Sequence, residues 1–387
     1  MPDLSPQYAA ELADDIYVVK SDLTRGDFKA VYEDDMELEG FDTPAGKGQL
    51  SGTTGAFVFI KTEHVMGVAA IGKGAYKNHA FVVLKGTASL LDALTDANAG
   101  LKRFATGGYV HQGFFYTFQS FLPNLKAFQI SLGQHNIHTI HCVGHSLGGA
   151  LATLAADWLQ SLLTCQVKLY TFGSPRVGLD LFASQATQSL GASNIFRVYH
   201  RTDPVPMVPT WPFVHVPAKG DDYLIDSPVR MVPWHYHSMG EYKKSTKGRQ
   251  WIEIKNSRPV GHLDQAVENW LKSTGALSFT ANTLELLNAS LWYVVKKIVD
   301  AAGILLVGGF ATTFTLLDRL AYLMSCAFDI SKQLSEWVVC LIKRMAQLLG
   351  IVIKEGVSLT HSFIRFVFMR LHSEVGAMIR QAGKLLE

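Results

Sequence analysis

The sequence predicts an α/β fold: a mostly parallel sheet covered by helices, followed by a helical region towards the C-terminal end. Three observations support this prediction. Short apolar runs of strand length alternate with helix-compatible segments up to about residue 245. The strand signals vanish after about residue 280. From Leu334 apolar residues recur at helical spacing. We therefore place a boundary near 275–285 and expect two domains, 1–282 and 283–387.

The expected elements can be placed in chain order. One helical stretch runs from Pro6 to Val19 within a polar and acidic N-terminal region. The expected strands are Gly55–Thr62, Ala80–Leu84, Asn136–Val143, Val167–Phe172 and Ile195–His200, with the Gly-rich stretch 67–74 separating the first two. The expected helices are 113–132 and 148–163, and an amphipathic helix starts at Leu334. Strands that alternate with helices in this way favour a parallel sheet with both faces covered.

The composition excludes some classes of protein. Only 18% of the 387 residues are charged, against about a quarter in an average soluble domain, and 48% are hydrophobic. The extra apolar surface must be buried deeply, paired with a partner or placed against lipid. A net charge of +2 gives no reason to expect nucleic-acid binding. The four cysteines form no C-x-x-C pair, so we expect neither a zinc site nor a disulfide framework.

Two features bear on location. The N-terminal stretch has no basic start and no apolar run, so it does not resemble a secretory signal, and we expect synthesis in the cytoplasm. Residues 296–387 carry a net charge of +4, which suits an anionic membrane surface. Membrane association and export by a signal-free route both stay open.

The most informative motif is a G-x-S-x-G pentapeptide at Gly144–Gly148. It lies between an expected strand and an expected helix, the context of a sharp turn that projects a serine hydroxyl clear of the backbone. Small residues on both sides of the serine permit such a turn. The start of the following helix offers N–H groups to a developing oxyanion. The pattern predicts Ser146 as a nucleophile and the Leu147 N–H as one oxyanion donor.

The segment GHSLGGALATLAA around Ser146 resembles the nucleophile segment of the class 3 lipase family, which contains fungal triacylglycerol lipases and plant phospholipase A1 enzymes. Four further segments match in the family's order: VVLKGTASLLDALTD at 82–96, VHQGF at 110–114, YTFGSPRVG at 170–178 and FRVYHRTDPVPMVP at 196–209. The resemblance spans roughly residues 50–245. It implies an α/β-hydrolase fold and lipase activity.

A serine nucleophile needs a histidine base and a carboxylate that holds the imidazole, in the chain order serine, acid, histidine. Asp203 lies just past an expected strand, and the resemblance implies that it is the catalytic acid. Other aspartates lack this placement: Asp180, Asp221, Asp222 and Asp226. For the base, HSMGEY at 237–242 is similar to the family's histidine segment, which favours His237. His235 is the second choice, and His215 and His262 are further candidates.

A second oxyanion donor is expected from the loop after an earlier strand. In the family, the Ser or Thr after the glycine of this loop gives its N–H, which implies Thr87 in Lys85-Gly86-Thr87. This chain departs from the family in having Lys85 for an arginine and Ala93 for a tryptophan. Lys lacks the planar fork of Arg, so local anchoring is expected to be weaker. The next segment, 90–98, has an apolar stripe and is interpreted either as a movable lid or as a fixed helix. We expect His111, in VHQGF, to make a structural hydrogen bond.

The longest uncharged run is Ala301–Leu317. At 1.5 Å per residue it spans about 25 Å, short of the roughly 30 Å hydrocarbon core of a bilayer. A short membrane span, a hydrophobic hairpin and a buried helix all stay open. The amphipathic stretch from Leu334 indicates either a helical cap packed on the protein or a membrane-docking appendage. We expect 283–387 to couple the protein to lipid rather than to supply chemistry.

These patterns predict a lipase that cleaves carboxylic esters of lipids, of the phospholipase A1 or acylglycerol type, through a Ser-His-Asp triad and an acyl-enzyme. This chemistry needs no metal or cofactor. A lipid or phospholipid is the expected substrate and a membrane surface the expected partner. A more specific hypothesis is an antibacterial effector exported without a signal peptide, with a secretion or immunity factor as protein partner. The alternative class is a non-catalytic, membrane-binding interaction protein on a hydrolase scaffold.

Overall fold

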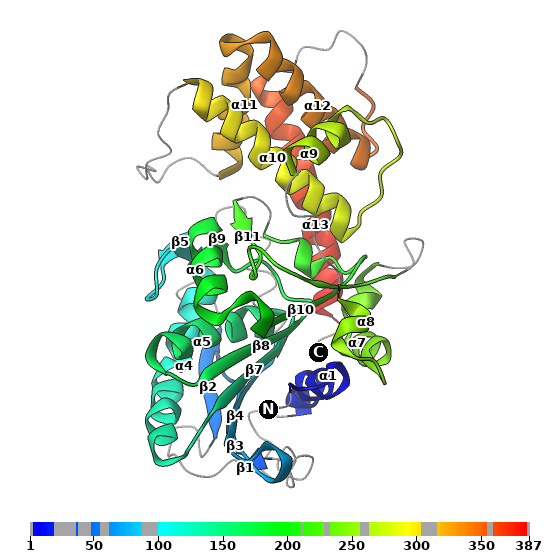
Figure 1. The fold of residues 1–387 in the computed structure, drawn as a ribbon. Coiled ribbons are helices and arrows are strands. Elements are labelled where there is room, and N and C mark those ends of the chain that lie inside the picture. Colours follow the sequence, from blue (N-terminus) through cyan, green and yellow to red (C-terminus); the bar gives the residue numbers. More distant parts are fainter. Residues whose placement is uncertain are drawn as a thin grey trace.

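The computed structural model describes residues 3–18, 36–37, 48–54, 62–86, 100–209, 212–227, 233–255, 263–302, 316–353 and 359–384. An α/β part with a central sheet lies at one end, and helices α9 to α12 lie together at the other (Figure 1). Helix α13 runs from those helices alongside the α/β part (Figure 1).

The elements are as follows. The strands are β1 (Met36–Glu37), β2 (Gln49–Thr54), β3 (Thr62–Gly72), β4 (His79–Leu84), β5 (Leu101–Arg103), β6 (Tyr109–His111), β7 (Thr139–His145), β8 (Gln166–Phe172), β9 (Gly178–Leu179), β10 (Ile195–His200), β11 (Phe213–Val214) and β12 (Tyr223–Ile225). The helices are α1 (Pro6–Asp15), α4 (Gln112–Ser131), α5 (Leu147–Leu162), α6 (Asp180–Leu190), α7 (Met239–Thr246), α8 (Trp251–Ile254), α9 (Leu263–Lys272), α10 (Ala281–Ala302), α11 (Leu316–Ile330), α12 (Lys332–Leu348) and α13 (His361–Gly383). Short 3₁₀ turns include η1 (Ile16–Val18), η5 (Val205–Met207) and η6 (Pro233–His237).

The central sheet is mostly parallel. Strands β4, β7, β8, β10 and β12 follow one another in that order and pair in parallel. Strand β3 pairs antiparallel with β4, and β1 and β2 pair antiparallel with β3. A second, smaller sheet has the order β11-β9-β6-β5 and is antiparallel. The predicted α/β fold with a mostly parallel sheet is therefore confirmed.

Both faces of the sheet are covered, so its central strands are buried at almost every position. Every residue of β4 and β7 is buried. In β4, Val82 faces the core shared with α4 and α5, whereas Phe81 and Val83 face a second core shared with α1 and α7. Because successive side chains of a strand point to opposite faces, a strand covered on both sides buries every position, including polar residues such as His141 and His145 of β7.

The element boundaries differ from the sequence-based expectation in one instructive place. The Gly-rich stretch 67–74 was expected to interrupt two strands, but residues up to Gly72 belong to β3. A Cβ atom on Gly67 would lie 2.1 Å from the carbonyl oxygen of Val83. Glycine therefore allows a close approach of β3 to β4 instead of breaking the strand. The expected strand Gly55–Thr62 lies outside the described residues except for Thr62.

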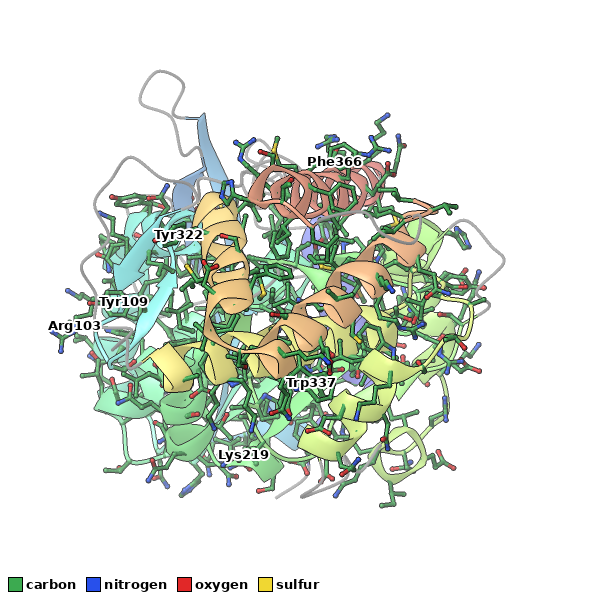
Figure 2. The ribbon with its side chains drawn as sticks, turned by 90° about the horizontal axis from the view of Figure 1, so that it is seen from above. Arg103, Tyr109, Lys219, Tyr322, Trp337 and Phe366 are labelled. Atoms are coloured by element: carbon green, nitrogen blue, oxygen red, sulfur yellow. The ribbon has the colours of Figure 1, made fainter. Side chains whose placement is uncertain are left out.

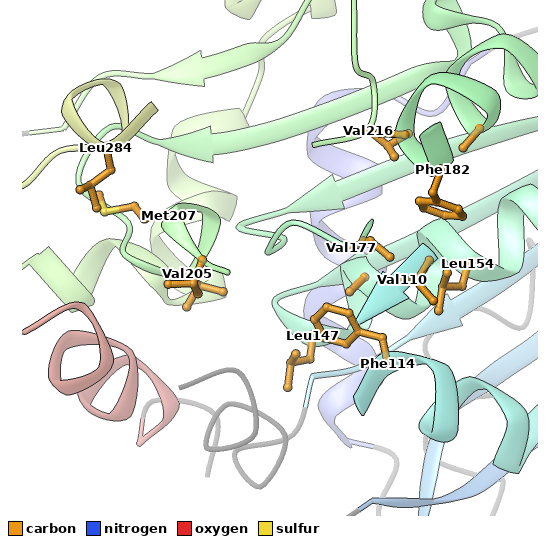
Figure 3. Close-up of a cluster of buried hydrophobic side chains, with 14 of the residues drawn as sticks. Val110, Phe114, Leu147, Leu154, Val177, Phe182, Val205, Met207, Val216 and Leu284 are labelled. Atoms are coloured by element: carbon orange, nitrogen blue, oxygen red, sulfur yellow. The ribbon is translucent and has the colours of Figure 1, made fainter. Parts of the chain in front are cut away.

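The C-terminal helices bury apolar side chains against the α/β part. Leu284 of α10 shares a core with Val205 and Met207 of η5 (Figure 3). Helix α13 contacts both η5 and η6. Helix α9 packs against α10 and α12 and so joins the C-terminal helices. The domain boundary near residue 282 stays a prediction.

The membrane-span hypothesis falls largely outside the described residues, because they omit 303–315 of the uncharged run Ala301–Leu317. Among the helices that the structure describes, none combines the length and the apolar character needed to cross a bilayer.

Candidate active site

The predicted site residues converge at the carboxyl edge of the parallel strands. Ser146 directly follows β7, and Asp203 lies three residues after the end of β10. His237 ends η6, which follows β12 in the chain. Ligand and catalytic sites of open α/β sheets are built at this edge, because the loops that leave the strands meet there.

The turn at Ser146 is a strained elbow between β7 and α5. Ser146 has φ 56° and ψ −129°, in the left-handed half of the backbone map that side chains other than glycine rarely adopt. A Cβ atom on Gly144 would lie 2.2 Å from the carbonyl oxygen of Gly148, and one on Gly148 would lie 2.1 Å from that of Leu84. Both glycines of the pentapeptide are therefore required by close backbone approach, and the elbow holds Ser146 at the sheet edge.

Ser146, His237 and Asp203 form a continuous hydrogen-bonded chain. The Ser146 Oγ atom lies 2.9 Å from His237 Nε2. His237 Nδ1 lies 2.9 Å from each carboxylate oxygen of Asp203. All three side chains are completely buried. The geometry is that of a serine–histidine–carboxylate triad, in which the carboxylate fixes the imidazole tautomer and the ring accepts the hydroxyl proton.

Two further groups hold the carboxylate of Asp203. The Tyr242 hydroxyl donates a hydrogen bond of 2.6 Å to Oδ2, and the Val205 N–H donates one of 2.9 Å to Oδ1. Burial, followed by the neighbouring negative charge of Asp203, raises the pKa of Tyr242 well above its ordinary value, so this phenol keeps its proton. Asp203 is thus held as an oriented hydrogen-bond acceptor.

The other candidate histidines lie elsewhere. His235 is half exposed, and its Nε2 atom lies 3.2 Å from Glu241. His215 contacts the carbonyl oxygen of Pro206 through Nε2. His262 lies outside the described residues. Of the two neighbours His235 and His237, the structure brings only His237 to Ser146.

The competing aspartates are engaged in other contacts or lie elsewhere. Asp222 forms a buried ion pair with Arg197, with a 2.9 Å contact. Asp221 pairs with Lys255 and Asp226 with Arg201. Asp180 begins α6.

The predicted oxyanion donors are described only in part. Leu147 is the first residue of α5, where helical N–H groups lack partners within the helix. Thr87 and the stretch 87–99, including the predicted lid, lie outside the described residues. The preceding residue, Gly86, is described: a Cβ atom built on it would lie 3.0 Å from Ser146 Cβ. The loop that leads to Thr87 therefore passes beside the nucleophile.

His111 has the structural role that the sequence indicated. It is the N-cap of α4, and its Nδ1 atom accepts a hydrogen bond of 3.1 Å from the Gly113 N–H.

Sequence reasoning missed several polar residues around the triad. Tyr242 holds Asp203, and the His200 ring stacks on Tyr242 with centroids 4.2 Å apart while its Nδ1 contacts the Tyr236 carbonyl. The signal for Tyr242 was present, since it ends the HSMGEY segment. His200 carried no local signal, because its role depends on a contact with a segment about 40 residues away. Within the described part of the chain, no group of three His, Cys, Asp or Glu residues could hold a metal ion.

The fold is that of an α/β-hydrolase, and the site geometry has the layout of a serine hydrolase. The model of the lipase (class 3) family matches residues 81–213, which confirms that this part of the chain resembles class 3 lipases.

Three relatives resemble parts of the chain. The chain is 36% identical over 168 residues to a secreted mono- and diacylglycerol lipase 1 of Fusarium solani, covering 41% of this chain and 49% of that protein. It is 33% identical over 138 residues to a phospholipase A1-II 1 of Oryza sativa subsp. indica, covering 33% of this chain and 34% of that protein. It is 37% identical over 105 residues to a toxin, TseL, of Vibrio cholerae, covering 27% of this chain and 15% of that protein. The chain thus matches about half or less of the length of these relatives. Among solved structures, lipase II from Rhizopus niveus has a TM-score of 0.42 at 23% identity, covering 57% of this chain and 79% of that one.

Proposed function

We propose that this protein is a serine hydrolase that cleaves carboxylic esters of lipids, of the phospholipase A1 or acylglycerol lipase type. The observation that carries the proposal is the buried chain of hydrogen bonds from Ser146 through His237 to Asp203, set on a strained glycine elbow. A serine that only stabilised the fold would not need this backbone strain, because strain of this kind persists where function requires it.

The proposed reaction proceeds through an acyl-enzyme. Ser146 Oγ attacks the ester carbonyl carbon while its proton passes to His237 Nε2, and Asp203 stabilises the imidazolium. The tetrahedral oxyanion is held by the Leu147 N–H and, by family resemblance, by Thr87. The intermediate collapses, and the leaving alcohol takes the proton from His237. Water then attacks the acyl-enzyme, with His237 as the base again, and releases the fatty acid.

Lipid as the substrate class is supported by two kinds of observation. Curated relatives carry the names mono- and diacylglycerol lipase and phospholipase A1. Ser146, Asp203 and His237 are fully buried, so an ester can reach Ser146 only after some covering segment moves. Such a closed site suits an enzyme that opens at a lipid surface.

A lipid-panel digestion tests the substrate class. Purified protein is incubated with mixed vesicles of phosphatidylcholine, phosphatidylglycerol and diacylglycerol, and the products are identified by mass spectrometry. We expect free fatty acid with lysophospholipid or monoacylglycerol from wild type and none from Ser146→Ala. Products without a fatty acid, or equal product from Ser146→Ala, would refute the proposal.

We propose further that the C-terminal helices dock the enzyme on membranes. Several large apolar side chains are exposed on α11 and α13: Tyr322, Phe328, Phe366 and Met369. Figure 2 labels Tyr322 and Phe366 on these two helices. The segment 296–387 also carries the excess positive charge. A Tyr322→Ser, Phe366→Ser double variant should keep turnover of a soluble ester and bind anionic vesicles less tightly. Unchanged vesicle binding would remove this part of the proposal.

A second, more specific function is that of an antibacterial effector that attacks the lipids of a rival cell. The supporting observation is the similarity of 105 residues to a protein named as a toxin. This role would require export from the producing cell and a protein partner for secretion or immunity. Expression directed to the bacterial periplasm should then be toxic, whereas cytoplasmic expression and periplasmic Ser146→Ala should not. If wild-type protein expressed in the periplasm were harmless, the effector role would be excluded.

A further inference from the structure

A second chain of hydrogen bonds, separate from the triad, runs behind the nucleophile. The Gly86 N–H donates to the Tyr17 hydroxyl oxygen at 3.1 Å. The same oxygen lies 2.8 Å from His145 Nδ1. On the other side of the ring, His145 Nε2 lies 2.8 Å from the carbonyl oxygen of His237. This series of hydrogen bonds therefore joins four residues, which come from η1, the loop after β4, β7 and η6.

The donor and acceptor roles in this chain are determined by its two ends. The Gly86 amide can only donate, so the Tyr17 oxygen accepts and its single proton points to His145 Nδ1. The His237 carbonyl can only accept, so His145 carries its proton on Nε2. A neutral ring meets both demands, whereas a doubly protonated ring would oppose the Tyr17 proton. Burial, followed by the repulsion of His237, lowers the pKa of His145 well below its ordinary value and keeps the ring neutral.

The hydrogen-bonded residues are chain neighbours of residues on which the proposed reaction depends. Gly86 precedes Thr87, the donor implied for the oxyanion. His145 precedes Ser146 and is fully buried. The His145 and His237 rings lie with centroids 4.7 Å apart, so His145 supports the base by contact as well as through the carbonyl.

We propose that Tyr17 and His145 are positioning residues that lock the oxyanion loop, the nucleophile elbow and the base-bearing turn η6 to one another. The inference rests on the proposed function and adds residues that the triad does not include. Tyr17 comes from the N-terminal segment, far from the other parts in sequence. Its hydroxyl bridges Gly86 N and His145 Nδ1 with one hydrogen bond to each.

Tyr17→Phe tests the proposal, because it removes the shared hydroxyl and keeps the ring. Kinetics on a soluble short-chain ester should show kcat lower by about 10- to 100-fold with KM within about twofold, since small misplacements of reacting groups cost up to about a hundredfold. The matched control is Tyr170→Phe. Tyr170 is fully buried, and its hydroxyl also ties down the N-terminal segment, by accepting a hydrogen bond of 3.4 Å from the Leu4 N–H instead of bridging Gly86 and His145.

The control separates positioning from general loosening. We expect Tyr170→Phe to keep wild-type kcat even if its melting temperature falls as far as that of Tyr17→Phe. Equal kcat losses in the two variants, or wild-type kcat in a folded Tyr17→Phe, would overturn the proposal. If the wild-type protein neither turns over the ester nor reacts with a fluorophosphonate, the proposed function itself fails.

Substitution of His145 tests the proposal independently, through the turnover of two variants. His145→Gln retains a side-chain N–H that can reach the His237 carbonyl, whereas His145→Leu is of similar size without a donor. Turnover should therefore be partly kept by Gln and lost further with Leu. The Tyr17→Phe, His145→Leu double variant should be little worse than His145→Leu alone, because groups that act as a unit are not additive. Fully additive losses would show that the two residues act separately.

Discussion

At the scale of single residues, the site depends on which of two neighbouring histidines faces the serine. The sequence placed both in PWHYH at 233–237 and favoured the second through its HSMGEY context. In the structure η6 turns His237 inward to Ser146 and Asp203, while His235 faces out to Glu241. Side chains two residues apart in a tight turn point in different directions, and packing decides which one is buried. That choice could not be made from spacing alone.

The two histidines should behave oppositely when substituted. His237→Ala should lower kcat on a soluble ester by at least about a thousandfold, because it removes the proton acceptor, and the Ser146→Ala, His237→Ala double variant should be little worse. His235→Ala, which loses only a half-exposed contact, should stay within about threefold of wild type. An inactive His235→Ala beside an active His237→Ala would contradict the assignment.

At the scale of elements, the strand-elbow-helix unit β7-Ser146-α5 was the part most readily predicted. The buried strand and the glycine spacing are local signals, and the structure places the strand and helix within three residues of their expected ends. The second oxyanion donor and the lid were predicted only through family resemblance, and Thr87 and 90–98 lie outside the described residues. Long-range contacts such as Tyr17 to Gly86 had no sequence signal, because nothing local ties residue 17 to residue 86.

The elbow gives a test at this scale. Gly148→Ala would place a Cβ atom 2.1 Å from the Leu84 carbonyl oxygen, so the strand or the helix must shift. We expect a loss of about 1–3 kcal/mol in the free energy of unfolding, measured by urea denaturation, together with a large loss of turnover. Gly133→Ala is the matched control, because no atom lies within 4 Å of the added carbon. Equal stability of the two variants would contradict the close approach.

At the scale of the whole molecule, the C-terminal helices contact the elements that carry the site. Helix α10 packs on η5, just after Asp203, and α13 packs on η5 and η6. Amphipathic spacing predicted a helix from Leu334, but not what its apolar face covers, because a helix face that suits a core also suits a membrane. In the structure, α10 buries part of its apolar surface within the protein, at Leu284, Leu287 and Leu291.

A truncation ending at residue 282 tests this packing. Each buried leucine contributes about 1.5–3 kcal/mol, and several are lost together, against a net stability of about 5–15 kcal/mol for a typical protein. We expect the melting temperature and the turnover of soluble ester to fall, and the turnover of vesicles to fall at least as far. A truncated protein with a normal melting temperature and full activity on soluble ester would show that the helices serve only lipid docking.

Acid should destabilise the whole molecule. Burial is the main cause that lowers the pKa of three fully buried imidazoles: His141, to about 3, His145 and His200. Below their ordinary pKa of about 6.5 these rings take up protons in the unfolded chain but not in the folded one, so stability falls as the pH drops. Each contributes up to about 1.4 kcal/mol per pH unit. Asp157, whose pKa burial raises to about 6, works in the opposite direction between pH 6 and 4.

Urea midpoints at pH 7 and pH 5 measure this dependence. The wild-type midpoint should fall, and it should fall less in His141→Phe, which removes one buried imidazole far from the triad. An equal pH dependence in both proteins would show that His141 does not contribute.

The central claim is that Ser146 is the nucleophile of this protein. Incubation with a fluorophosphonate, followed by intact-mass and peptide-mass analysis, tests it most directly. We predict one adduct per chain, on the peptide that contains Ser146, with complete loss of ester hydrolysis, and no adduct on a Ser146→Ala protein of unchanged melting temperature. An adduct on a different residue, or ester turnover that persists in folded Ser146→Ala, would contradict the account.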